Sequence, residues 1–209
     1  MSAAEDFDLY FAECPLVAVI RGVAPDDAEA TATAIFEGGI RIIEVPLNSP
    51  RPFDSIEIIA TALGDRALIG AGTVLNTDEV QRVQAVGGRL IVAPNMNEEV
   101  IRATADAGMV SSPGVFTPTE AFAAIAAGAH ALKLFPAEAA SPAVVKAQKA
   151  VLPKGFPLIV VGGVRVDNVA EWLEAGADGF GLGSGLYTPG QDPQLTLEQA
   201  RAFVAAVRR

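Results

Sequence analysis

The chain has 209 residues, of which 51% are hydrophobic and 19% are charged, so it can bury a sizeable core and suits one large domain or two small ones. Its 25 acidic and 15 basic residues give a formal net charge of -10, which argues against a general nucleic-acid or anionic-membrane surface. We expect one domain over residues 1–209, which must meet any anionic substrate in a local cationic pocket.

Apolar runs followed by helix signals recur along this chain. A short helix, predicted up to Cys14, precedes the first run. Glycines that end a helix recur about every 20 to 25 residues, which is the length of one strand, one helix and short turns. In chain order the predicted strands are 16–21, 40–47, 67–73, 90–93, 109–112, 131–135, 158–161 and 179–182, with helices over 25–37, from Ser49 to about Leu63, and from Thr77.

Eight strand–helix units indicate a parallel α/β sheet, and they fit a (β/α)8 TIM barrel of one domain with a short N-terminal helix. A doubly wound open sheet with fewer strands is the alternative. The placement of polar residues and glycines favours the barrel, because in a barrel the carboxyl ends of all strands share one mouth. The residues at or just beyond those ends are Arg21, Glu44, Thr73, Asn95, Lys133, Gly162, Gly163 and Ser184.

Lys133 stands in the middle of the apolar run 131–135. Alternation along a strand puts Ala131, Lys133 and Phe135 on one face, so the amine points into whatever the sheet encloses. Loss of hydration lowers the pKa of a lysine, and a free amine can attack a carbonyl and form a Schiff base. A lysine at a strand end that pairs with a carboxylate is the alternative.

Glu44 interrupts a second apolar run and shares its face with Ile42. An unpaired carboxylate there is costly, so Glu44 needs either a partner or a chemical task. In the same mouth as a Schiff-base lysine it can transfer protons as a general acid/base. The alternative is an ion pair between Glu44 and Lys133, which returns little more energy than its desolvation costs.

Two consecutive predicted strands, the seventh and eighth, end in glycines that expose backbone N–H groups. In barrels the loops after these strands, with the start of a short extra helix, commonly bind phosphate. Ser184 adds a hydroxyl to this predicted phosphate site, although glycines also end strands simply to turn the chain. The residues concerned are Gly162 and Gly163 after the seventh strand and Gly183 and Ser184 after the eighth.

Arg21 and Thr73 complete the predicted mouth. Arg21 can hold a carboxylate or phosphate in a fixed fork geometry, and Thr73 offers a hydroxyl beside two glycines. His130 precedes Lys133 by three residues and so points to the opposite face, where a packing or capping role is expected.

The lone Cys14 cannot form an internal disulfide, and a single histidine cannot build a multi-histidine metal site. We therefore expect a reduced, cytoplasmic protein without metal or other cofactor. No apolar run reaches the ~20 residues of a membrane span, and the acidic residues 1–13 are unlike a secretory signal. No membrane or nucleic-acid partner is expected.

Arg21 and the runs 44–49 (Glu-Val-Pro-Leu-Asn-Ser), 70–75 (Gly-Ala-Gly-Thr-Val-Leu), 133–136 (Lys-Leu-Phe-Pro), 162–164 (Gly-Gly-Val) and 183–184 (Gly-Ser) together resemble the class I 2-keto-3-deoxy-6-phosphosugar acid aldolases. The resemblance covers almost the whole chain, with its motifs in order and at barrel spacing. It implies a (β/α)8 barrel that forms a homotrimer and acts on pyruvate and a phosphosugar acid. It further implies that Lys133 forms the Schiff base, Glu44 is the general acid/base, Arg21 and Thr73 bind the keto-acid end, and Gly162, Gly163, Gly183 and Ser184 hold phosphate.

Within the family, the chain resembles the branch that acts on 2-dehydro-3-deoxy-6-phosphogalactonate. Members of this branch cleave that substrate to pyruvate and glyceraldehyde 3-phosphate, and the resemblance implies the same reaction here. Members of the gluconate branch often have threonine and arginine in place of Pro46 and Asn48, and threonine in place of Val161. The gluconate epimer is therefore the alternative substrate. Arg165 departs from the threonine or serine that is common there, and it either contacts phosphate or faces solvent.

Two other classes of function are compatible with the residues alone. A phosphate-binding barrel that acts as an isomerase or synthase would keep the glycines but need no Schiff base. A non-catalytic sugar-phosphate-binding barrel would need neither a reactive amine nor turnover. Treatment with pyruvate and borohydride separates the three, because only the aldolase leaves a lasting adduct on Lys133.

Overall fold

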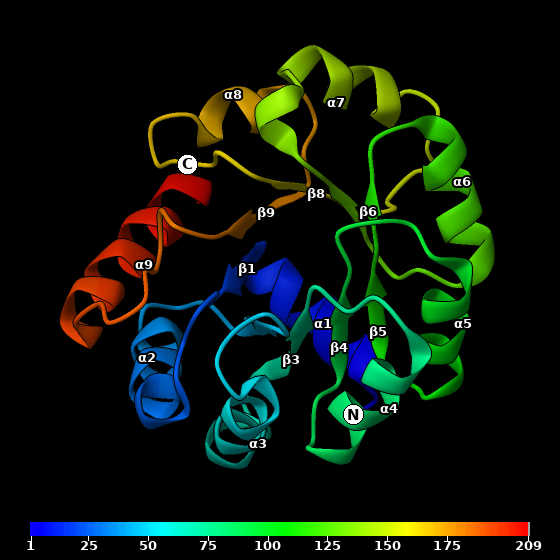
Figure 1. Ribbon diagram of the computed structural model, residues 1–209. Helices are drawn as coiled ribbons and strands as arrows, with labels where there is room; N and C mark the ends of the chain where they lie inside the picture. The colour runs from blue at the N-terminus through cyan, green and yellow to red at the C-terminus, as the bar shows by residue number, and fades with distance from the viewer. Residues whose placement is uncertain (209) are drawn as a thin grey trace.

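A computed structural model describes residues 1–208, and in it helices surround a ring of strands (Figure 1). The strands are β1 (Leu16–Val19), β2 (Ile42–Pro46), β3 (Leu68–Gly72), β4 (Leu90–Val92), β5 (Val110–Ser112), β6 (Gly114–Val115), β7 (Leu132–Leu134), β8 (Leu158–Val161) and β9 (Gly179–Leu182). The helices are α1 (Ala3–Glu13), α2 (Pro25–Glu37), α3 (Pro52–Leu63), α4 (Thr77–Ala85), α5 (Glu98–Asp106), α6 (Pro118–Ala127), the 3-10 turn η1 (Ala137–Ala139), α7 (Pro142–Lys149), α8 (Val169–Glu174) and α9 (Pro193–Val207).

All paired strands run parallel, in the order β5-β4-β3-β2-β1-β9-β8-β7-β6. β1 pairs with both β2 and β9, so the first and last strands of the chain are neighbours. The ring closes at β5 and β6, where β5 pairs with β4 and β6 pairs with β7. Across this seam the Ala131 N–H donates to the Ser111 carbonyl at 3.3 Å. The structure is thus the predicted (β/α)8 barrel and not the open doubly wound sheet.

The fifth apolar run differs from its prediction. The sequence predicts a strand that ends at Ser112, whereas the structure continues it as β6 through Val115. Pro113 separates the two pieces because it has no backbone N–H to donate to a ladder. Its carbonyl still accepts the Lys133 N–H at 2.9 Å, which holds β7 against the seam. Eight predicted runs therefore appear as nine short strands.

Side chains alternate between two apolar layers. Leu132 and Leu134 belong to the large outer cluster between the sheet and the helices. Ala131 and Ile42 belong to the smaller cluster inside the ring, as alternation predicts. The Phe7 side chain of α1 joins this inner cluster, so α1 closes the bottom of the barrel.

α1 is also tied to the barrel through charge and hydrogen bonds. The buried Asp6 carboxylate lies 2.6 Å from the Arg89 guanidinium, which precedes β4. At the start of α1, Ser2 and Glu5 form a reciprocal capping box that satisfies two backbone N–H groups. The helix therefore begins and docks at defined residues.

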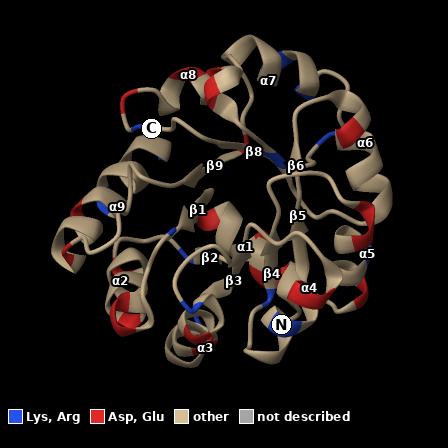
Figure 2. Ribbon diagram, in the orientation of Figure 1, with Lys and Arg blue, Asp and Glu red and all other residues tan. Residues whose placement is uncertain are grey.

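The surface is predominantly acidic, and the acidic positions are spread over the outer helices (Figure 2). Within residues 1–208, no helix has the length and apolar character that crossing a membrane would require.

Candidate active site

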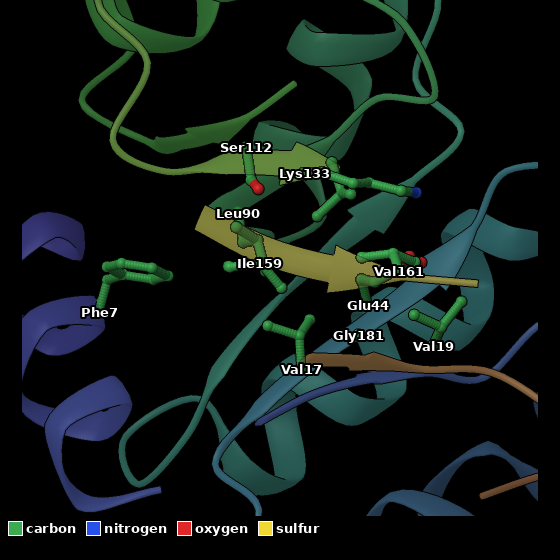
Figure 3. Close-up of a pocket in the computed structure, with 11 residues that line it drawn as sticks. Phe7, Val17, Val19, Glu44, Leu90, Ser112, Lys133, Ile159, Val161 and Gly181 are labelled. Atoms are coloured by element: carbon green, nitrogen blue, oxygen red, sulfur yellow. The ribbon is translucent and has the colours of Figure 1, made fainter. Parts of the chain in front are cut away.

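Glu44 and Lys133 lie inside the barrel near its mouth, in the middle of β2 and β7. Both side chains are buried, with exposed fractions of 1% for Glu44 and 6% for Lys133. Figure 3 shows the two residues reaching the interior from different strands. Gly72 makes room for the carboxylate, because a Cβ atom at that position would collide with it. The predicted inward orientation of both residues is confirmed.

The two buried groups do not form an ion pair. Among the described residues, every ion pair within 4 Å joins other side chains. Glu44 Oε2 is buried and has no hydrogen-bond partner there. Lys133 Nζ instead lies 4.6 Å from the centre of the Phe135 ring. The alternative interpretation, a plain Glu44–Lys133 ion pair, is therefore wrong.

Burial shifts the pKa of the two groups in opposite directions. Desolvation raises the pKa of Glu44 from 4.5 to about 7, although the positive charges of Lys133 and Arg21 act to lower it. Desolvation lowers the pKa of Lys133, a shift that the Glu44 charge opposes and the Arg21 charge reinforces. Near neutral pH, Glu44 can both donate and accept a proton. A larger fraction of Lys133 is present as the free amine than for a lysine in water.

Arg21 and Thr73 meet at the mouth with a third residue, Asn48. Arg21 lies just after β1, and both of its Nη atoms are 3.5 Å from the Thr73 hydroxyl oxygen. Arg21 Nη1 also donates to Asn48 Oδ1, just after β2. The positive φ of Thr73, 57°, is unusual for a branched residue and aims its side chain into this cluster. Asn48 was part of a sequence motif but not of the predicted site, and its link to Arg21 is visible only in the fold.

The four predicted phosphate residues line a single cleft of about 370 Å³. Gly162 and Gly163 have φ angles of 113° and 65°, which favour glycine. No other described residue accepts the backbone N–H of Gly162, Gly163 or Ser184, so these donors are available to an anion. The short extra helix expected here is a single turn, in which the Tyr187 N–H donates to the Gly183 carbonyl at 3.1 Å.

Arg165 and Glu138 also line this cleft. Arg165 Nε donates to Asp167 Oδ1 at 3.0 Å on the exposed surface, so its charge is already engaged. The Glu138 carboxylate lies directly over Gly162, where an added Cβ would collide with it. Sequence reasoning missed Glu138, because nothing in its pattern places η1 over the end of β8.

His130 lies outside the site, as predicted. Its ring is half-buried, and Nδ1 accepts the Ser111 N–H at 3.2 Å. Burial lowers its pKa. Residues 1–208 contain no group of three or more His, Cys, Asp or Glu side chains placed to hold a metal ion.

A barrel with a buried lysine and a buried carboxyl group near its mouth, and a glycine-lined cleft beside them, has the groups that a Schiff-base aldolase requires. The family model for KDPG and KHG aldolase matches residues 8–193. The chain therefore belongs to the KDPG and KHG aldolase family, and the predicted family resemblance is confirmed.

Three similar proteins cover nearly the whole chain. The 2-dehydro-3-deoxy-6-phosphogalactonate aldolase of Escherichia coli K12 is 50% identical over 194 residues, which span 93% of this chain and 95% of that protein. A solved structure described as native KDPGal superposes with a TM-score of 0.91 at 49% identity, over 93% of this chain and 94% of that one. The KDPG aldolase of Legionella pneumophila, solved with pyruvate captured as a covalent carbinolamine, has a TM-score of 0.84 at 29% identity, over 93% and 96%.

Proposed function

We propose that this chain is a class I aldolase that cleaves 2-dehydro-3-deoxy-6-phosphogalactonate to pyruvate and glyceraldehyde 3-phosphate. The observation that carries the proposal is the pair of buried groups, Lys133 and Glu44, which share the barrel mouth without neutralising each other. The 50% identical relative from Escherichia coli supports the galactonate epimer as substrate. The reaction needs no cofactor, because the protonated imine accepts the electrons of the broken bond.

In this mechanism Lys133 is the nucleophile and Glu44 moves the protons. The free amine of Lys133 adds to the C2 carbonyl, and protonated Glu44 donates to the carbinolamine hydroxyl as water leaves. Glu44 then takes the proton of the C4 hydroxyl while the C3–C4 bond breaks, and the electron pair moves into the imine to give an enamine. Protonation of C3 and addition of water to the imine release pyruvate and restore the lysine.

The remaining predicted residues hold the two anionic ends of the substrate. Arg21 and the Thr73 hydroxyl bind the carboxylate, with Arg21 oriented by Asn48. The phosphate occupies the cleft that Gly162, Gly163, Gly183 and Ser184 line, where backbone N–H groups and one hydroxyl can donate to it. The Glu138 side chain, which is exposed, must turn away from the cleft when phosphate enters.

Borohydride reduction in the presence of pyruvate tests the Schiff base. The expected result is one reduced pyruvate adduct per chain, located on Lys133 by peptide mass analysis. Lys149→Arg is a matched control. Lys149 is paired with Asp178 at 2.6 Å and should carry no adduct in the wild type, and the variant should still be modified on Lys133. Absence of an adduct on Lys133 would refute the mechanism and favour an isomerase, a synthase or a binding protein.

We also propose that the protein is a cytoplasmic homotrimer. The trimer follows from the family resemblance, and light scattering coupled to size-exclusion chromatography measures it directly. The location follows from the substrate, since a phosphorylated sugar acid carries several charges that do not cross a bilayer unaided. Cell fractionation of the native source with an antibody against the chain tests the location.

A further inference from the structure

A tight turn after β1 carries Arg21. Arg21 and Gly22 are its two central residues, and the Val23 N–H donates across it to the Ile20 carbonyl at 3.3 Å. The φ angle of Gly22 is 82°, which matches the third residue of a type II turn and favours glycine there. A type I turn could join the same residues if the peptide between Arg21 and Gly22 flipped. A contact from outside the turn can select between these two forms.

Ser49 supplies such a contact. The Gly22 N–H, which belongs to the peptide that would flip, donates to Ser49 Oγ at 2.9 Å. Ser49 is 7% exposed, and its own N–H donates to the Pro46 carbonyl at the end of β2 at 2.9 Å. A flip would point the Gly22 N–H away from Ser49 and break this hydrogen bond. The hydroxyl therefore favours the form of the turn that the structure shows.

Packing against the segment after β9 also restricts the turn. A Cβ atom on Gly22 would lie 2.6 Å from Pro189 Cγ. The Pro189 side chain limits the space around Gly22, but it has no polar atom to accept a hydrogen bond. Among residues 1–208, Ser49 is thus the only acceptor for the Gly22 N–H.

Asn48 and Ser49 are consecutive residues that hold the same arginine at two points. Asn48 Oδ1 accepts the Arg21 guanidinium, whereas Ser49 Oγ accepts the backbone N–H directly after Arg21. No carboxylate of the described residues lies within 4 Å of that guanidinium, so its charge is available to a substrate. Ordering a long, exposed side chain before the substrate arrives lowers the entropy that binding costs.

We propose that Ser49 is a positioning residue, whose hydroxyl fixes the Arg21–Gly22 turn and so preorganises the Arg21 guanidinium for the carboxylate of pyruvate. Ser49 does not touch the substrate and acts through Arg21 alone. This inference rests on the proposed aldolase activity.

Loss of the hydroxyl should weaken substrate binding more than the chemical step. In Ser49→Ala, we expect the KM for pyruvate to rise about three- to tenfold in the exchange of its methyl protons with D2O, which is the size of one hydrogen bond. The kcat of this exchange should stay close to the wild-type value, because Lys133 and Glu44 are unaltered. Ser49→Thr keeps the hydroxyl and should keep most of the affinity. NMR measures the exchange rate at a series of pyruvate concentrations.

A double-mutant cycle tests whether Ser49 acts through Arg21. Arg21→Ala removes the guanidinium and should lower kcat/KM for the exchange, and the addition of Ser49→Ala should lower it no further. Ser55→Ala is the matched control, because Ser55 is a buried serine on α3 whose hydroxyl has no hydrogen-bond partner within residues 1–208. This control should keep the wild-type KM, and thermal unfolding checks that each variant is folded.

A wild-type KM in folded Ser49→Ala would overturn the proposal. So would a loss of kcat/KM on Ser49→Ala that is equally large with and without Arg21. Hydrogen exchange provides a test without any variant, because the Gly22 amide should exchange slowly in the wild type, and exchange at the rate of an unprotected amide would exclude the hydrogen bond to Ser49. A wild-type protein that neither exchanges pyruvate protons nor gives the borohydride adduct would instead refute the aldolase itself.

Discussion

Glu44→Gln should change how the free energy of unfolding depends on pH. The pKa of Glu44 rises from 4.5 in the unfolded chain to about 7 in the fold, so the folded state binds the proton more tightly in that interval. Stability conferred by the protonated carboxyl is fully present below pH 4.5 and falls as pH rises toward 7. A shift of this size corresponds to about 3 kcal/mol of pH-dependent free energy of unfolding. Glutamine does not titrate, so the variant lacks this contribution.

Lys133 contributes a pH dependence of the opposite sign to the free energy of unfolding, in the wild type and in Glu44→Gln alike. Its lowered pKa makes the fold more stable as pH rises from the folded pKa toward 10.5. Removal of the Glu44 charge lowers the pKa of Lys133 further, so the variant gains stability at a lower pH than the wild type. The Glu44 contribution is lost only in the wild type, and the Lys133 contribution is gained at a lower pH in the variant. For both reasons the wild type loses stability relative to Glu44→Gln as pH rises from 4.5 to 7.

Urea unfolding at several pH values between 4.5 and 8 measures this difference at fixed protein concentration. The fluorescence of Trp172, the single tryptophan, reports unfolding because its ring is buried. Glu138→Gln removes an exposed carboxylate at the mouth and is the matched control for the loss of one negative charge there. Parallel curves for Glu44→Gln and the wild type would refute the reasoning, since they would mean that burial does not perturb this carboxyl group.

Three further experiments address the chemistry. Lys133→Arg keeps the charge but cannot form the imine, so aldol cleavage should be lost while circular dichroism shows an intact fold; measurable turnover at the wild-type rate would exclude a Schiff base on Lys133. EDTA should leave the initial rate unchanged, and a loss that zinc or magnesium restores would contradict a class I mechanism. Val161→Thr adds a hydroxyl to the wall of the site and should shift the ratio of kcat/KM toward the gluconate epimer by ~0.5–1.5 kcal/mol, up to roughly tenfold; an unchanged ratio would show that Val161 does not select the epimer.

The sequence predicts most of the fold and the centre of the site, because both depend on local periodicity. Lys133 and Glu44 each interrupt an apolar strand, and alternation alone is enough to turn them inward. The helix over 25–37 and the strands at 158–161 and 179–182 have their predicted bounds, since proline and glycine mark them. Arg21 follows β1 and Thr73 follows β3, so both are expected at the same barrel mouth once the strands are known to be parallel.

What the sequence does not predict depends on contacts between distant segments. The link from Arg21 to Asn48 requires the spacing of two loops, and the position of Glu138 over Gly162 requires the path of η1.

The closed ring also limits how copies of this chain can associate. Each strand in the part of the chain that the structure describes has a neighbour on both sides, with β5 and β6 sharing that task at the seam. A barrel of this kind offers no free sheet edge for a strand of another molecule to extend. Any contact between protomers must therefore use the outer helices and loops, and Glu44 on β2 and Lys133 on β7 meet inside a single chain.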